Sequence, residues 1–231
     1  MQIMSLLPFY VYLASTGVAA IIALYAFFRF FLKYREVYTP QLFYLSMFFF
    51  FFSINYFVVF LRAILGRNMF FYTVSNLFGP LALVFIMAFA VSLVWSGRER
   101  LSFAFSLSMF AIFFGASLYS DSSVIAIYPG VSEVVYPYSF VLLTLLTISS
   151  LAFFVFAVFS VYAFRARWSA LRRGGMMFAS GFLILAIFTY LFDWPGLFAF
   201  LLPFTRLMNA SGIFLVYLGA RTLQSAKVPF F

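Results

Sequence analysis

Seven apolar stretches, each about as long as a membrane-spanning helix, constrain the fold of this chain more than any other feature. The hydrocarbon core of a bilayer is about 30 Å thick, so a spanning helix takes roughly 20 mainly apolar residues. The stretches are 7–31, 41–63, 70–95, 101–119, 138–163, 176–193 and 198–220. Their connections are short, so we predict an all-α fold with a single domain over residues 1–231, a bundle of seven transmembrane helices.

The composition supports a membrane protein. Hydrophobic residues make up 67% of the chain and charged residues 8%, which is more apolar than a soluble domain of 231 residues. The net charge of +9 could suggest a nucleic-acid partner, but the Lys and Arg residues are dispersed at the ends of the apolar stretches. We therefore expect membrane lipids, and no nucleic acid, around this protein.

The basic residues predict the orientation. Eleven of the fourteen Lys and Arg follow the first, third, fifth and seventh stretches and so share one side. They are Arg29, Lys33, Arg35, Arg98, Arg100, Arg165, Arg167, Arg172, Arg173, Arg221 and Lys227. The opposite side has Arg62 and Arg67 with Asp121, Glu133 and Asp193, while Arg206 lies inside the last stretch. Because positive loops stay inside, we predict a multi-pass protein of the cytoplasmic membrane with its N-terminus outside and its C-terminus cytoplasmic.

The residue types that are missing exclude several kinds of chemistry. The chain has no histidine and no cysteine, which excludes His- or Cys-ligated haem and removes the usual metal ligands and the usual general base. A seven-helix topology with an outside N-terminus resembles that of microbial rhodopsins and seven-helix receptors, but a retinal Schiff base requires an intramembrane lysine. Lys33 and Lys227 are the only lysines, and both lie beyond membrane depth. We expect no retinal, no other cofactor, no metal and no enzymatic activity.

Polar residues within the apolar stretches are the candidate binding residues. Arg206 and Asn209 are three apart and share a helix face, and a charged side chain at membrane depth usually faces the bundle interior. By predicted depth they share the outer half of the bundle with Asn55, Asn76 and Asp193, which is the best candidate to pair with Arg206; Tyr190 and Thr144 are possible further members. These residues predict an outward-facing polar ligand cavity, or alternatively helix–helix hydrogen bonds with an arginine that reaches the membrane boundary.

Two connections have features of their own. Residues 120–137, interrupted by Pro129-Gly130, predict an outer β-hairpin or a flap on the membrane surface, which would be either a lid or an ordinary loop. The cytoplasmic connection 165–175 carries Arg165, Arg167, Arg172 and Arg173. These arginines could contact a partner protein or anionic lipid, or could act only in orienting the chain.

The sequence favours a non-enzymatic accessory or scaffold subunit of a larger membrane complex, because catalytic groups and a soluble output domain are absent. One alternative is a sensor that binds a small molecule or lipid in the outward cavity and signals to a separate cytoplasmic partner. A second alternative is a transporter with helices broken at Pro80 and Pro203. Expected partners are other membrane subunits or a second copy of the chain. Glycines such as Gly212 and Gly219 would then support either internal packing or a seam between copies.

Overall fold

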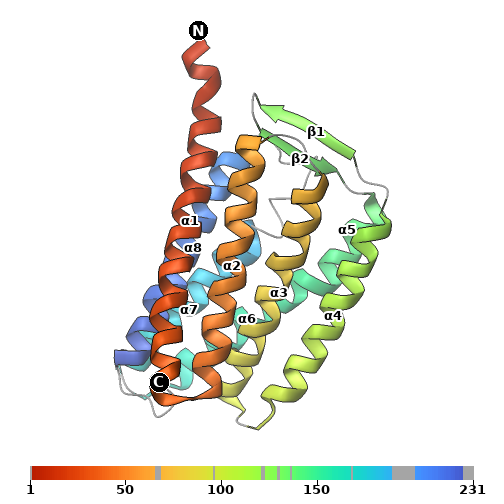
Figure 1. Cartoon of the computed structure of the whole chain (residues 1–231). Coiled ribbons are helices and arrows are strands. Elements are labelled where there is room, and N and C mark those ends of the chain that lie inside the picture. Colours follow the sequence, from red (N-terminus) through yellow and green to blue (C-terminus); the bar gives the residue numbers. More distant parts are fainter. Residues whose placement is uncertain are drawn as a thin grey trace.

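The computed structural model describes residues 2–65, 69–95, 97–120, 123–128, 131–135, 137–167, 169–188 and 201–225. They form a bundle of roughly antiparallel helices with one small β-hairpin (Figure 1). The helices are α1 (Gln2–Val37), α2 (Pro40–Leu65), α3 (Met69–Val94), α4 (Glu99–Tyr119), α5 (Tyr138–Thr144), η1 (Leu145–Ser149), α6 (Ser150–Arg165), α7 (Ser169–Ile187) and α8 (Leu202–Ser225).

The helices close into a ring. In order around it, α1 packs on α2, α2 on α3, α3 on α6, α6 on α7, α7 on α8, and α8 again on α1. Helix α4 lies outside this ring against α3 and the α5–η1 segment, and of its residues only Ser106 and Phe113 are buried. The chain enters at one end of the bundle, and α8 finishes at the opposite end (Figure 1).

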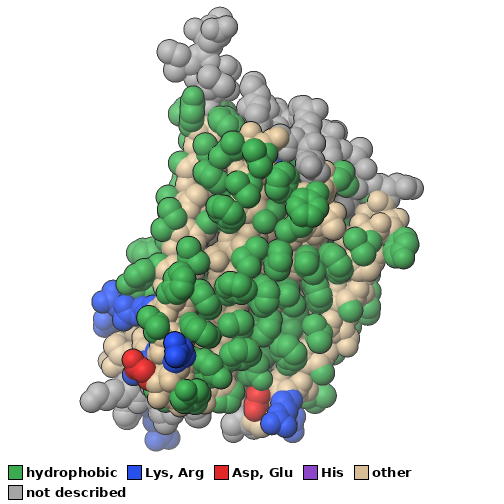
Figure 2. Space-filling model, in the orientation of Figure 1, with side chains coloured by type: hydrophobic (Ala, Val, Ile, Leu, Met, Phe, Trp, Pro, Cys, Tyr) green, Lys and Arg blue, Asp and Glu red, His purple; other side chains and the backbone are tan. Residues whose placement is uncertain are grey.

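The membrane character predicted from the sequence is confirmed in its coarse form. Among the described residues, six helical stretches are long and apolar enough to cross a membrane. Apolar side chains cover most of the visible face, and Lys and Arg gather at the end where α8 finishes (Figure 2). Helix α8, which carries Arg206, Asn209 and Arg221, is not among the six. The count of seven spans therefore stays a prediction.

Phenylalanine fills the centre of the ring. Phe48, Phe89, Phe159, Phe178 and Phe182 are fully buried and come from α2, α3, α6 and α7. The rings of Phe159 and Phe178 stack with centroids 4.2 Å apart, and Phe178 and Phe182 are nearly parallel at 6.1 Å. Offset and stacked ring pairs of this kind add to the dispersion contacts of the core. The phenylalanine-rich run of α2 thus contributes to the packing of the core.

The sixth predicted helix begins earlier in the structure than the sequence predicted. The sequence predicted a helix from residue 176 and a connection over 165–175, but α7 begins at Ser169 and includes Arg172 and Arg173. Gly174-Gly175 lowers intrinsic helix propensity, yet α7 runs through both glycines. Here the two glycines are needed for close packing, because a Cβ on Gly174 would lie 2.9 Å from the Leu223 side chain and one on Gly175 would lie 3.0 Å from that of Ala163.

Glycine also decides how α7 meets α8. A Cβ on Gly181 would lie 2.7 Å from the carbonyl oxygen of Gly212, and one on Gly219 would lie 2.8 Å from the carbonyl oxygen of Gly174. No real Cβ fits at these distances, so the two backbones approach each other as only glycine allows. Gly212 and Gly219 therefore serve internal packing, and their face is not available as a seam between copies.

The fifth predicted helix, 138–163, contains a π-helical turn that the sequence did not predict. The turn η1 (Leu145–Ser149) joins α5 to α6 without interrupting the helix. Thr147 donates from its hydroxyl to the carbonyl of Leu143 at 2.7 Å, and Ser150 donates to that of Leu146 at 2.8 Å. Such turns are rare and hold an extra residue within an otherwise regular helix.

The connection 120–137 contains the predicted β-hairpin. Strands β1 (Ser123–Tyr128) and β2 (Val131–Val135) pair antiparallel, and Ser123 lies opposite Val135. The register shifts between Ala126 and Tyr128. The hairpin lies at the end of the bundle where the chain begins (Figure 1).

The α7–α8 contact gives the first prediction. Gly181→Ala should lower the unfolding free energy by about 1–3 kcal/mol, because the new methyl group collides with backbone atoms of α8. Unfolding by sodium dodecyl sulfate in mixed micelles measures the change. Gly115→Ala on α4 is the matched control, since a Cβ there meets no atom within 4 Å. Equal effects at the two positions would mean that α7 and α8 do not approach so closely.

Candidate functional site

Two arginines converge inside the bundle, one turn or so from the ends of their helices. Arg62 lies in the last turn of α2 and is 4% exposed, and Arg206 lies near the start of α8 and is 5% exposed. The antiparallel course of the chain brings both to the end at which α1 begins. A buried guanidinium group costs free energy unless it is hydrogen-bonded or paired, so these positions mark a specialised part of the fold.

Tyr12 of α1 connects the two arginines. The Nη2 atom of Arg62 donates to the hydroxyl oxygen of Tyr12 at 2.9 Å. The Cζ atom of Arg206 lies 5.6 Å from the centroid of the same ring. One tyrosine therefore receives one guanidinium at its hydroxyl and the other near its face.

Two further tyrosines lie close to the arginines. The Cζ atom of Arg62 lies 4.2 Å from the ring centroid of Tyr72 on α3, and that of Arg206 lies 6.0 Å from the ring centroid of Tyr56 on α2. Tyr56 and Tyr72 are both buried. Cation–π contacts contribute roughly 0.5–2 kcal/mol, toward the upper end when desolvated as here. We call Tyr12, Tyr56, Arg62, Tyr72 and Arg206 the arginine–tyrosine cluster.

The backbone carbonyl of Tyr12 accepts two side-chain hydrogen bonds within α1. The hydroxyl of Thr16 donates to the carbonyl of Tyr12 at 2.8 Å, and that of Ser15 donates to the same carbonyl at 3.1 Å. The ring of Tyr12 packs with Val59 of α2 and Leu202 of α8. These contacts fix Tyr12 at the meeting point of three helices.

The predicted polar residues divide into two groups. Arg206 belongs to the cluster, and Asn209, one turn farther along α8, is fully buried. Asn55 instead joins α2 to α3: its Oδ1 accepts a hydrogen bond from Ser75 at 2.7 Å, and its side chain fills the space left by Gly79. This contact is the helix–helix hydrogen bond expected as the alternative to a binding role.

Of the remaining predicted residues, two are described and two are not. Asn76 is half-buried on α3. Thr144 of α5 donates within its own helix, to the carbonyl of Phe140 at 2.9 Å. Asp193, the candidate ion-pair partner of Arg206, and Tyr190 lie outside the described residues.

Arg62 and the three tyrosines were not among the predicted site residues. Arg62 was counted as an outer charge that helps to set the orientation, although it lies within the predicted helix 41–63. It is seven residues from Asn55, a spacing that puts the two side chains on one helix face. That spacing was a usable signal, whereas the approach of Tyr12 and Tyr72 from other helices depends on tertiary packing and had none.

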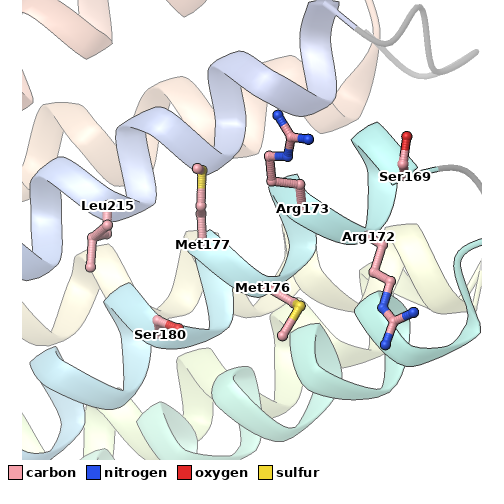
Figure 3. A pocket seen from close by; sticks show the side chains of 7 residues that line it. All are labelled: Ser169, Arg172, Arg173, Met176, Met177, Ser180 and Leu215. Atoms are coloured by element: carbon pink, nitrogen blue, oxygen red, sulfur yellow. The ribbon is translucent and has the colours of Figure 1, made fainter.

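The four arginines predicted on the cytoplasmic connection are all exposed, and three of them lie within helices. Arg165 ends α6, Arg167 follows it, and Arg172 and Arg173 lie in the first turns of α7. Arg172 and Arg173 line a hollow of about 530 Å³ on α7 (Figure 3). A second hollow, of about 600 Å³, lies between α3, α4 and α6 and has Arg98 and Trp95 in its lining.

Neither chemistry nor sequence similarity assigns a reaction to these residues. Among the described residues there is no group of three or more His, Cys, Asp or Glu side chains that could hold a metal ion. No protein-family model matches the sequence, and no curated protein matches it significantly.

The Arg62–Tyr12 hydrogen bond gives the second prediction. Tyr12→Phe keeps the ring beside Arg206 but removes the oxygen that accepts from Arg62, so we expect a loss of about 1.5–3 kcal/mol of unfolding free energy. Detergent unfolding of the purified variant measures this loss. Tyr10→Phe on the same helix, where the side chain is 58% exposed, should be neutral. A neutral Tyr12→Phe would show that the hydroxyl does not support the buried arginine.

Proposed function

We propose that this protein crosses the cytoplasmic membrane seven times, with its N-terminus outside and its C-terminus in the cytoplasm. The gathering of basic side chains at one end of the bundle supports this orientation (Figure 2). The length of α8, 24 residues, supports the seventh span, since a spanning helix takes roughly 20 residues. Its polar residues Arg206 and Asn209 are buried in the bundle and thus kept from lipid.

We further propose that the arginine–tyrosine cluster is the ligand-responsive part of a non-enzymatic sensor. The observation that carries this proposal is the convergence of Arg62 and Arg206 on Tyr12 near the outer end of the bundle. Guanidinium groups with tyrosine hydroxyls beside them recognise carboxylate or phosphate groups through charge-assisted hydrogen bonds. The proposed ligand is therefore an anionic small molecule or an anionic lipid that arrives from outside.

The same cluster offers a way to transmit binding. Its members belong to α1, α2, α3 and α8, so a ligand that draws either arginine away from Tyr12 alters contacts among four helices. Helix α8 runs from the cluster to the basic end of the bundle, where a separate cytoplasmic partner would detect its shift (Figure 1). A ligand shifts such an equilibrium only by its difference in affinity for the two arrangements.

An accessory subunit of a membrane complex is the second candidate, and α4 favours it. This helix lies outside the ring and exposes Leu101, Phe105, Ile112 and Leu118, which could pack on another membrane subunit. A transporter has less support, because α3 continues through Pro80 and Pro203 is the second residue of α8, where proline is tolerated.

Arg206→Met tests the sensor proposal and gives the third prediction. We expect the variant to fold with equal or higher thermal stability in mild detergent, because a guanidinium group costs free energy to hold at membrane depth and a methionine side chain does not. We also expect it to lose an anionic molecule that mass spectrometry detects in organic extracts of the purified wild-type protein.

Arg221→Met is the matched control, because Arg221 is exposed on the same helix and should affect neither readout. Unfolding of Arg206→Met would instead identify Arg206 as a structural support. No change in either stability or bound molecule would exclude both roles. Stoichiometric protein subunits in the same preparation would favour the accessory-subunit candidate.

Cysteine labelling tests the orientation and the seventh span, and gives the fourth prediction. The chain has no cysteine, so single substitutions report their own position without background. In intact cells, a membrane-impermeant maleimide should label Tyr119→Cys at the end of α4. It should reach Ser169→Cys and Ser225→Cys, at the start of α7 and the end of α8, only after permeabilisation.

Each departure from this pattern has a distinct meaning. The reverse pattern would invert the orientation. Labelling of Ser225→Cys together with Tyr119→Cys in intact cells, with Ser169→Cys protected, would mean that α8 does not cross the membrane.

A further inference from the structure

The hollow on α7 combines a cationic end with an apolar floor. Ser169, Arg172 and Arg173 line one end, and Met176, Met177 and Leu215 of α8 line the rest together with Ser180. Figure 3 shows the two guanidinium groups leaving α7 on different sides, with the methionine side chains one turn farther along the helix. From Ser169 to Ser180 the hollow follows α7 for about 16 Å, or three helical turns.

The two arginines place positive charge near the N-terminus of α7, where positive charge is unfavourable for a helix. Arg172 and Arg173 lie in the first turns of α7, and the first turn has no acidic residue. The partial positive charge of the helix N-terminus adds to that of the two guanidinium groups, whereas helices are stabilised by negative charge there. The end of the hollow is therefore complementary to an anion.

The apolar floor restricts the kind of anion. Met176 is 49% exposed, and the methionine pair with Leu215 lies farther from the basic end of the bundle than the arginines. A soluble acidic partner could reach Arg172 and Arg173, but the methionines would lie below it, at the depth of the hydrocarbon. An anionic molecule with an attached hydrocarbon chain covers both parts, and flexible methionine side chains adapt to such a chain.

We propose that this hollow binds one anionic phospholipid. Its phosphate lies at the end of the hollow that Arg172 and Arg173 line, and one acyl chain runs over Met176, Met177 and Leu215. The site is separate from the arginine–tyrosine cluster and requires only that α7 begins at a membrane surface, so it stands or falls independently of the sensor proposal.

Native mass spectrometry of the full-length, delipidated protein tests this site. The protein in mild detergent is titrated with phosphatidylglycerol, and separately with phosphatidylcholine, and the one-to-one complex is quantified. Two positive charges near an anionic headgroup correspond to a change of roughly thirtyfold in affinity, so Arg172→Gln/Arg173→Gln should weaken phosphatidylglycerol binding by about that factor. The control is Arg165→Gln/Arg167→Gln, which removes the same charge from exposed positions that do not line the hollow and should bind like wild type.

A second variant tests the hollow without changing the charge. Ser180→Trp fills the apolar end from an exposed position and should weaken phosphatidylglycerol binding while both arginines remain. Equal weakening by the two arginine pairs would reduce the effect to general surface charge and overturn the proposal. So would equal binding of phosphatidylcholine and phosphatidylglycerol to the wild type, or undiminished binding by Ser180→Trp.

Discussion

Close packing has to hold this bundle together, because in a lipid environment apolar side chains gain little by leaving lipid for protein. The α7–α8 pair meets this constraint with glycines at which no Cβ fits, so that backbone atoms of the two helices lie in contact. The centre of the ring meets it with phenylalanines from four helices, whose rings are stacked between α6 and α7 and tilted where α2 and α3 join them. Once α8 is fixed on α7, its other side is fixed against α1, and this arrangement sets Arg206 beside Tyr12.

The buried arginines are accommodated by sharing a neighbour. A tyrosine has a hydroxyl that accepts a hydrogen bond and a ring face that attracts a cation, and Tyr12 uses the first for Arg62 and the second for Arg206. Two cations so near a common residue repel each other more strongly in a medium of low dielectric constant than in water.

The parts of the fold that follow from hydrophobic length were predictable from the sequence. The helices over 41–63, 70–95 and 101–119 correspond closely to α2, α3 and α4, because lipid imposes their length and character. The start of α7 was not predictable, because Gly174-Gly175 lowers helix propensity. Only the close packing of Leu223 and Ala163 against these glycines accounts for their place within the helix. Of the arginine–tyrosine cluster, Arg206 was predicted from the cost of a charge at membrane depth, whereas the tyrosines are ordinary membrane residues until packing brings them to the arginines.

The π-helical turn η1 lets one helix pack against two different sets of neighbouring helices. Above the turn, α5 packs on α4, and below it α6 packs on α3 and α7. An α-helix rotates its side chains by about 100° per residue, so the extra residue in the turn shifts the phase of everything that follows by about that angle. The first half of the helix packs Phe140 against Phe113, and the second half places Phe159 in the central stack. The two halves therefore present different faces of one continuous helix. Because of this turn, one segment of chain packs against the peripheral helix α4 with its first half and against the ring with its second half.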